Sequence, residues 1–333
     1  MSIPIPSRVL VTGATGLLGS HAVRALLDAG HGVRAFVRNP SKASHLFPDA
    51  PAALEVAQGD IANRRSVEVA LEGCDALIHC AAMVAIGSAS APATLIETNV
   101  EGVRNVIGTA LKRGIERIVH VSSIAPLFRN DGRPITETSE PQPSSHAYGQ
   151  SKMMAEAYVR ELQAAEQPIQ ILYPGAIIGP DDPGLTASMR SVQIFAQVFL
   201  PLTTSGIQYV DVRDLSDGLV RMIRDEPKAR RYLAAGQFIA WRDLASLLER
   251  ATGQRPPARR VSAPLLRFAG RLADSLRSVV PIELPLSLES ATYVTRWNPI
   301  ENSEGFERLG VEFRSLEESM FDTVRWMQRA GHL

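Results

Sequence analysis

The chain has 333 residues, of which 45% are hydrophobic and 21% charged, a composition typical of soluble globular proteins. Lysine plus arginine and aspartate plus glutamate each number 35, so no net charge draws the protein to nucleic acid or anionic lipid. Two cysteines, Cys74 and Cys80, are too few for a disulfide framework, and no His/Cys cluster has the spacing of a zinc site. We therefore expect neither a nucleic-acid-binding protein nor a metalloprotein.

The start of the chain, "MSIPIPSRVLVTG", holds two early prolines and no apolar run of signal-peptide length. Nowhere do 18 uncharged apolar residues follow one another. We expect a cytoplasmic protein without an integral membrane span.

Short apolar or β-branched runs alternate with longer helical patterns in the first half. Strands are expected at 8–12, 31–38, 53–58, 75–82, 116–123 and 168–174, and helices at 17–29, 63–72, 91–113 and 148–165. This alternation predicts an α/β fold, a Rossmann-type doubly wound parallel sheet with helices on both faces.

The regular alternation of strand and helix patterns ends after residue 174. A helix is expected at 186–200, segment 206–223 is expected to return to the sheet and continue as a helix, and from about 237 the pattern is mostly helical. We expect a nucleotide-binding domain over 1–173 with a returning piece near 206–236, and a smaller, mainly substrate-binding lobe within 174–333.

A glycine-rich turn, "VTGATGLLGS", follows the first expected strand and opens a helix. Glycine permits a sharp turn, and the N–H groups of a helix N-terminus attract a diphosphate. The spacing is G-x-x-G-x-x-G, unlike the G-x-G-x-x-G of ordinary dinucleotide domains, and a plain tight connection is the alternative. The expected cofactor contacts here are Gly13, Thr15, Gly16, Leu17, Leu18 and Gly19.

The end of the second strand indicates which cofactor is favoured. An acidic residue there would accept the ribose hydroxyl of NAD, but the position holds Arg38, followed by Lys42. Cations suit the 2′-phosphate of NADP, so NADP(H) is favoured and NAD(H) stays open. Solvated loop charges are the alternative. Asp60, with Ile61 beside it, is a candidate for contact with the adenine ring.

One of only four lysines, Lys152, stands four residues after Tyr148 in "HAYGQSKMM". On a helix the two side chains lie one above the other, on the stripe that carries Ala155 and Val159. A lysine on the side expected to be buried breaks the local pattern, and an ammonium there would lower the pKa of the Tyr148 phenol toward the working pH. A lysine reaching solvent at the helix edge is the alternative.

Polar and small side chains follow two further strands. Ser122 and Ser123 end the strand 116–123, where a hydroxyl could orient a substrate carbonyl or simply cap a turn. Ala81 and Ala82 end the strand 75–82 and leave room for a cofactor.

Glycine turn, serine and Tyr-x-x-x-Lys together resemble the extended short-chain dehydrogenase/reductase family, in the branch of dihydroflavonol reductases and 3β-hydroxysteroid dehydrogenases. The resemblance covers nearly the first 235 residues and includes "ETNVEGVRNV", "YGQSK", "YPGAIIGP" and "YVDVRDLSDG". It implies a catalytic set of Ser123, Tyr148 and Lys152. It also implies cofactor contacts from Asn99, Ser122, Tyr148, Lys152, Tyr173, Pro174 and Gly175. Tyr173 departs from the arginine that many relatives carry before Pro-Gly, and Pro126 and Leu127 alter the loop that lines the substrate site.

The leading hypothesis is an enzyme that moves hydride between NADP(H) and a ketone or secondary alcohol, with a small-molecule substrate and a homodimer as one candidate assembly. A nucleotide-sugar epimerase or dehydratase with tightly bound NAD is the alternative among enzymes. A non-catalytic sensor of nicotinamide nucleotides is the alternative of another class.

Segment 264–286 places leucines and Phe268 on one expected helical face with arginines between them. This face is interpreted as a lid over an apolar substrate, a helix lying on a membrane, or ordinary packing surface. The lid interpretation favours an apolar, ring-containing substrate.

Overall fold

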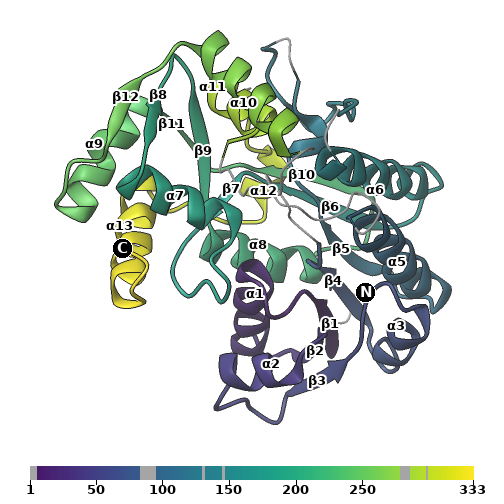
Figure 1. Cartoon of the computed structure of the whole chain (residues 1–333). Coiled ribbons are helices and arrows are strands. Elements are labelled where there is room, and N and C mark those ends of the chain that lie inside the picture. The colour runs from purple at the N-terminus through teal and green to yellow at the C-terminus, as the bar shows by residue number, and fades with distance from the viewer. Residues whose placement is uncertain (1–5, 83–94, 130–131, 145–146, 278–285, 298) are drawn as a thin grey trace.

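The computed structural model describes residues 6–82, 95–129, 132–144, 147–277, 286–297 and 299–333. Its centre is a seven-stranded sheet in the order β10-β6-β5-β4-β1-β2-β3, and every neighbouring pair is parallel. The Rossmann-type fold predicted from the sequence is confirmed (Figure 1).

The main-sheet strands are β1 (Arg8–Thr12), β2 (Gly32–Val37), β3 (Leu54–Gln58), β4 (Ala76–His79), β5 (Arg117–Val121), β6 (Ile169–Pro174) and β10 (Arg230–Ala234). The helices that accompany them are α1 (Leu17–Asp28), α2 (Pro40–Leu46), α3 (Arg64–Ala70), α5 (Gly102–Lys112), α6 (Ala147–Ala164) and α8 (Val212–Arg224). The expected elements of the first half therefore agree with the structure within a few residues. Residues 83–94, which include the start of the expected helix 91–113, lie outside the described part.

Helices cover both faces of this sheet. Helices α1 and α8 pack together on one face, while α3, α5 and α6 lie on the other (Figure 1). The central strands β4 and β5 are buried along their whole length, because each of their faces meets a layer of helices. This double covering explains the apolar runs in the sequence.

A second, smaller unit follows β6. It contains β7 (Ala176–Ile178), β9 (Gly206–Asp211) and β11 (Gln237–Ala240) in one sheet, and β8 (Leu200–Leu202) paired with β12 (Ala258–Arg260). Its helices are α7 (Ala187–Gln197), α9 (Trp241–Thr252), α10 (Ala263–Arg277), α11 (Leu288–Thr295) and α13 (Leu316–Arg329). The short helix α12 (Glu304–Arg308) packs against β10 of the main sheet.

One expectation for this region is wrong. Segment 206–211 does not rejoin the main sheet, because β9 pairs with β7 and β11, and the last strand of the main sheet is β10 instead. Helix α8, which follows β9 directly, does return to the main sheet and packs on α1.

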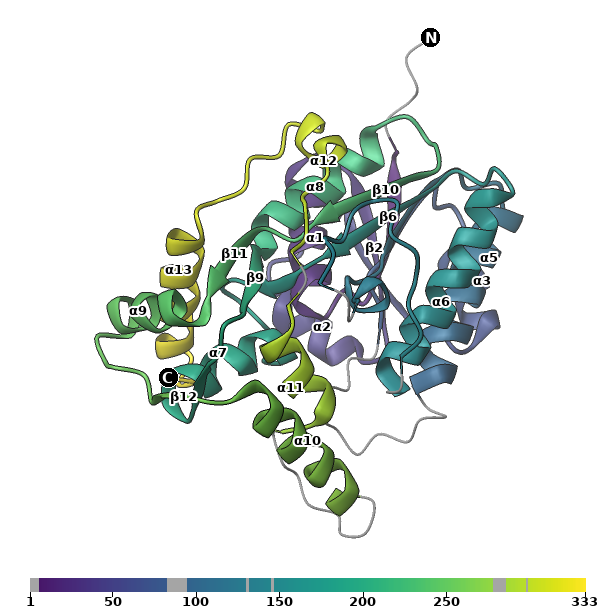
Figure 2. The same ribbon diagram turned by 90° about the horizontal axis from the view of Figure 1, so that it is seen from above.

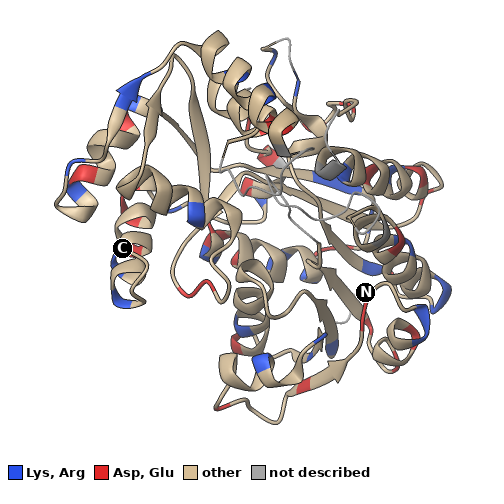
Figure 3. Ribbon diagram, viewed as in Figure 1, with Lys and Arg blue, Asp and Glu red and all other residues tan. Residues whose placement is uncertain are grey.

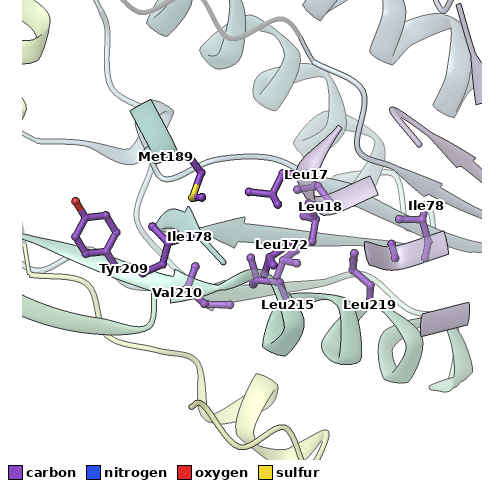
Figure 4. Close-up of a cluster of buried hydrophobic side chains, with 14 of the residues drawn as sticks. Leu17, Leu18, Ile78, Leu172, Ile178, Met189, Tyr209, Val210, Leu215 and Leu219 are labelled. Atoms are coloured by element: carbon purple, nitrogen blue, oxygen red, sulfur yellow. The ribbon is translucent and has the colours of Figure 1, made fainter. Parts of the chain in front are cut away.

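One hydrophobic cluster connects the two units. Leu17 and Leu18 of α1 meet Leu172 of β6, and the same cluster continues through Ile178 and Tyr209 of the smaller sheet (Figure 4). Residues expected to contact a cofactor at the start of α1 thus have side chains that belong to the core, which leaves their backbone N–H groups for binding.

The strand order reverses between β1 and β4, since the chain runs outward through β2 and β3 and then resumes on the other side of β1. Ligands of such sheets bind outside the carboxyl ends of the strands at this point. The residues after β1, β4, β5 and β6 therefore frame the candidate site.

Candidate active site

The glycine turn is held by close backbone packing. Gly13 has a φ of 69°, and a Cβ on it would stand 2.8 Å from the Ala81 nitrogen. A Cβ on Gly19 would collide with the Gly13 carbonyl oxygen. The turn therefore brings β1, α1 and the residue after β4 into contact that only glycine allows.

This turn fits a dinucleotide diphosphate. Gly16 is exposed at the N-cap of α1, and within the described residues no side chain caps the N-terminus and no acidic residue stands in its first turn. Uncapped N–H groups at a helix start bind anions through hydrogen bonds and the helix dipole. Thr15 lies beside them, half-buried.

The second and third strands place their candidate residues differently. Arg38 and Lys42 are exposed after β2. Among the described residues none forms an ion pair with Arg38, which leaves its guanidinium able to bind a phosphate. The Asp60 carboxylate accepts a hydrogen bond from the Ala62 nitrogen at 2.9 Å and so braces its own turn. Ile61 is buried against Gly102 of α5.

Helix α6 carries the predicted tyrosine and lysine. Tyr148 belongs to its first turn, and its side chain lies outside the described part. Lys152 is only 6% exposed, so the expectation that it interrupts a buried face is confirmed, with Ala155 and Val159 buried beside it. Burial lowers the pKa of Lys152 to about 8, and the nearby Glu156 carboxylate opposes that shift.

Glu156, one helical turn after Lys152, is fully buried and accepts hydrogen bonds from three elements. The Ser122 hydroxyl of β5's end donates to Oε2 at 2.7 Å, and Arg160 Nε donates to Oε1 at 2.6 Å. The Tyr173 hydroxyl of β6 donates to the same Oε1. The carboxylate thus joins α6 to the carboxyl ends of β5 and β6.

Tyr173, at the position where the family resemblance implies an arginine, is hydrogen-bonded to Arg160 of α6. The guanidinium of Arg160 also donates to the Tyr173 hydroxyl at 3.2 Å and to the Ser139 carbonyl at 3.0 Å. Burial, followed by the charge of Glu156, raises the pKa of Tyr173 well above its ordinary value, so this phenol keeps its proton. A cation on α6 therefore lies beside the position where many relatives carry an arginine.

The two serines after β5 have different surroundings. Ser122 is buried, and its hydroxyl donates a hydrogen bond to the Glu156 carboxylate. Ser123 is half-buried, and its hydroxyl oxygen accepts a hydrogen bond from the Ala125 nitrogen at 3.1 Å. The Ser123 proton is not needed for that bond. Ser123 is therefore the better placed of the two to donate to a substrate.

A single π-helical turn, η1 (Glu97–Glu101), precedes α5. Such turns are rare and occur frequently at functional sites. It carries Asn99, which is buried and donates from Nδ2 to the Ser151 hydroxyl at 3.0 Å. Asn99 is thereby tied to the residue that precedes Lys152.

A pair of histidines lies beneath the site. His79 and His120 occupy paired positions of β4 and β5, and their rings stack with centroids 5.4 Å apart. The Thr12 hydroxyl is hydrogen-bonded to His79 Nδ1 at 2.6 Å and accepts a hydrogen bond from the Ala81 nitrogen at 3.2 Å. Burial, and then the charge of Lys152, lowers the pKa of His79 to about 3, so the imidazole is neutral.

The remaining candidates lie at the same edge. Ala81 and Ala82 follow β4, and Pro174 ends β6. A Cβ on Gly175 would stand 2.6 Å from the Ala235 carbonyl oxygen, so this turn also requires glycine.

Five residues of this region were not singled out from the sequence as parts of the site: Thr12, His79, His120, Glu156 and Arg160. Glu156 and Arg160 did leave a signal, because they continue the four-residue spacing from Lys152. The histidines left none, since a polar residue inside an apolar strand does not show which neighbour it will face.

An uncapped glycine turn at the reversal of a parallel sheet, with a buried lysine one turn after a tyrosine, defines a nicotinamide-dinucleotide enzyme of the Rossmann type. Comparison with known proteins agrees. The model of the NAD dependent epimerase/dehydratase family matches residues 9–235, and the chain belongs to this family. It is an oxidoreductase of the extended short-chain type, as the resemblance implied.

Two curated relatives cover almost the whole chain. "Sterol demethylase protein B" of Methylococcus capsulatus is 30% identical over 97% of this chain and 98% of its own. "Putative dihydroflavonol 4-reductase" of Synechocystis is 31% identical over 97% of this chain and 95% of its own. The solved structure of gox2253 is 28% identical, with a TM-score of 0.82, over 98% of this chain and 99% of that one.

Replacing Glu156 by glutamine should lower the free energy of unfolding by about 3–5 kcal/mol, because Arg160 loses its buried counter-charge. Chemical denaturation measures this. Glu161→Gln, on the exposed side of the same helix, is the matched control and should change little. Equal stability of the two variants would contradict the account of the network.

Lys152 should lose its proton at about pH 8 in the folded protein. Because its pKa lies below the unfolded value, this group's contribution to stability rises between pH 8 and that value. With four lysines in the chain, carbon-13 NMR of labelled Cε atoms resolves the titration, and Lys152→Arg assigns the signal. A Lys152 signal that titrates near the ordinary value of about 10.4 would refute the burial argument.

Proposed function

We propose that the protein transfers hydride between NADP(H) and a ketone or secondary alcohol, with Ser123, Tyr148 and Lys152 as its catalytic residues. The observation that carries the proposal is Lys152, an almost fully buried cation on the helix turn after Tyr148, at the edge where the strand order reverses. Burying a cation costs desolvation free energy, so cations are buried where they take part in chemistry or in an ion pair.

The proposed chemistry divides between cofactor and chain. When bound, the nicotinamide supplies or accepts the hydride. Tyr148 gives its phenolic proton to the carbonyl oxygen during reduction and takes it back during oxidation. The ammonium of Lys152 stabilises the phenolate, and the Ser123 hydroxyl donates a hydrogen bond that holds the carbonyl oxygen.

Three features support the cofactor proposal. The uncapped start of α1 suits the diphosphate, the glycines at 13 and 175 allow close approach, and Arg38 suits the 2′-phosphate of NADP. The acid that would accept the ribose hydroxyl of NAD is replaced by Arg38. This replacement also speaks against an epimerase with permanently bound NAD.

An aromatic cluster supports an apolar, ring-containing substrate. Phe128, five residues after Ser123, lies edge-on to Tyr293 of α11 at 4.8 Å between ring centroids and to Trp297 at 6.3 Å. All three rings are half-buried, which leaves part of their surface available to a planar or hydrocarbon ligand. Two relatives are named for a sterol and for a dihydroflavonol.

Purified protein should oxidise NADPH with a panel of cyclic and aryl ketones, and Tyr148→Phe should lower turnover by about a hundredfold or more through loss of the acid. Lys152→Arg should fold and lose most turnover, since a planar guanidinium does not replace a compact ammonium. Lys112→Arg, exposed on α5, is the matched control. Unchanged turnover by Tyr148→Phe would remove the assignment, and NAD retained through purification would favour the epimerase.

Arg38→Glu should weaken NADPH binding by about tenfold or more while sparing NADH, because charge-assisted hydrogen bonds to the 2′-phosphate contribute roughly 1.5–3 kcal/mol. Fluorescence titration with both cofactors measures the two dissociation constants. Arg329→Glu, exposed on α13, controls for the change of net charge. Equal losses for NADPH and NADH would show that Arg38 does not select the cofactor.

A further inference from the structure

Helix α10 exposes an apolar ridge of four large side chains. Leu265, Phe268, Leu272 and Leu276 are 61%, 64%, 53% and 45% exposed. Their spacing of three, four and four residues puts them on one face of the helix. Among the described residues ten large hydrophobic side chains are at least 36% exposed, and four of them lie on this one helix, so the ridge is a concentration rather than scattered surface.

The opposite face of α10 is already fastened to the protein. Leu266 and Ala273 are buried, and a Cβ on Gly270 would stand 2.6 Å from the Ser287 carbonyl oxygen next to α11. Arg267 donates to the Thr295 hydroxyl at 3.0 Å, and Asp274 accepts from the Leu288 nitrogen at 2.9 Å. The helix therefore does not need the ridge in order to pack.

The charge of this region differs from that of the whole chain. Residues 255–277 contain six arginines and one aspartate, although the chain as a whole has no net charge. Arg259 and Arg260 are exposed in β12, which Figure 3 shows as a blue arrow, and Arg271 is exposed on α10. The single acidic side chain of this stretch, Asp274, is engaged with α11.

The ridge lies at the periphery of the molecule. Figure 2 shows α10 extending beyond α11 at the edge of the smaller unit, away from the main sheet. No helix in the described part of the chain is long and apolar enough to cross a membrane. Contact with a bilayer would therefore be made from one side, by a helix lying along its surface.

We propose that α10 docks the protein onto an anionic lipid surface, with the ridge of Leu265, Phe268, Leu272 and Leu276 in the interface and the neighbouring arginines against the headgroups. Apolar side chains on one face and arginines beside them are the combination that such surfaces bind. A second copy of the chain is a poorer occupant, because two copies would bring their arginines together.

The docking and the proposed activity are separable. The ridge contains no residue of the candidate active site, so vesicle binding can be measured without a substrate. An enzyme placed on a bilayer would meet apolar substrates where they dissolve, which is how this inference bears on the proposed function.

Flotation of the full-length protein with vesicles tests the proposal. Vesicles of phosphatidylcholine with phosphatidylglycerol should carry the protein, vesicles of phosphatidylcholine alone should carry much less, and added salt should release it. Phe268→Asp with Leu272→Asp should abolish binding. Arg271→Gln should weaken it about fivefold, the share of one arginine near an anionic surface.

Val69→Asp, a 51% exposed position on α3, is the matched control and should bind as the wild type does. Thermal melts confirm that each variant is folded. Two results would overturn the proposal: no vesicle binding by the wild type, or ridge variants that bind vesicles as the wild type does. A dimer that the ridge variants abolish, without vesicle binding, would identify a contact between two copies of the chain. Ridge variants that change only KM for a ketone, without vesicle binding, would identify a substrate lid instead.

Discussion

The buried carboxylate of Glu156 is the interaction on which the arrangement of the site depends. It accepts hydrogen bonds from Ser122, Arg160 and Tyr173, and so ties the end of β5 and the end of β6 to helix α6. The same helix carries Lys152 one turn earlier, where the carboxylate favours the charged form of the lysine against the effect of burial. The Glu156 carboxylate therefore helps to determine both the position and the charge of Lys152. Removing this carboxylate would leave the buried Arg160 guanidinium with the exposed Glu140 carboxylate, at 3.1 Å, as its remaining counter-charge.

Much of the fold could be predicted because each signal is local. Alternation of short apolar runs with helical patterns, and the glycine turn after β1, require no knowledge of distant contacts. Which sheet β9 joins could not be predicted in this way. Its apolar residues suit any sheet, and the choice between β6 and β7 as a neighbour is made by tertiary packing, which a strand pattern does not record.

The candidate site shows the same division. The burial of Lys152 follows from its place on a helical stripe, and the structure confirms it. The sequence marks Tyr173 only as a departure from the family pattern, whereas the structure shows its hydroxyl accepting a hydrogen bond from Arg160. The contact between β6 and α6 is made by tertiary packing, which the local sequence pattern does not record. The overall composition does not show how charge is distributed along the chain. The net charge is zero, yet the stretch that leads into α10 is basic.

A crystal structure with bound NADPH tests the central claim most directly. The account predicts the nicotinamide ribose hydroxyls within hydrogen-bond distance of Lys152 Nζ, the diphosphate at the start of α1 and the 2′-phosphate at Arg38, with Glu156 keeping its three donors. A cofactor bound elsewhere, or a ribose out of reach of Lys152 Nζ, would contradict it.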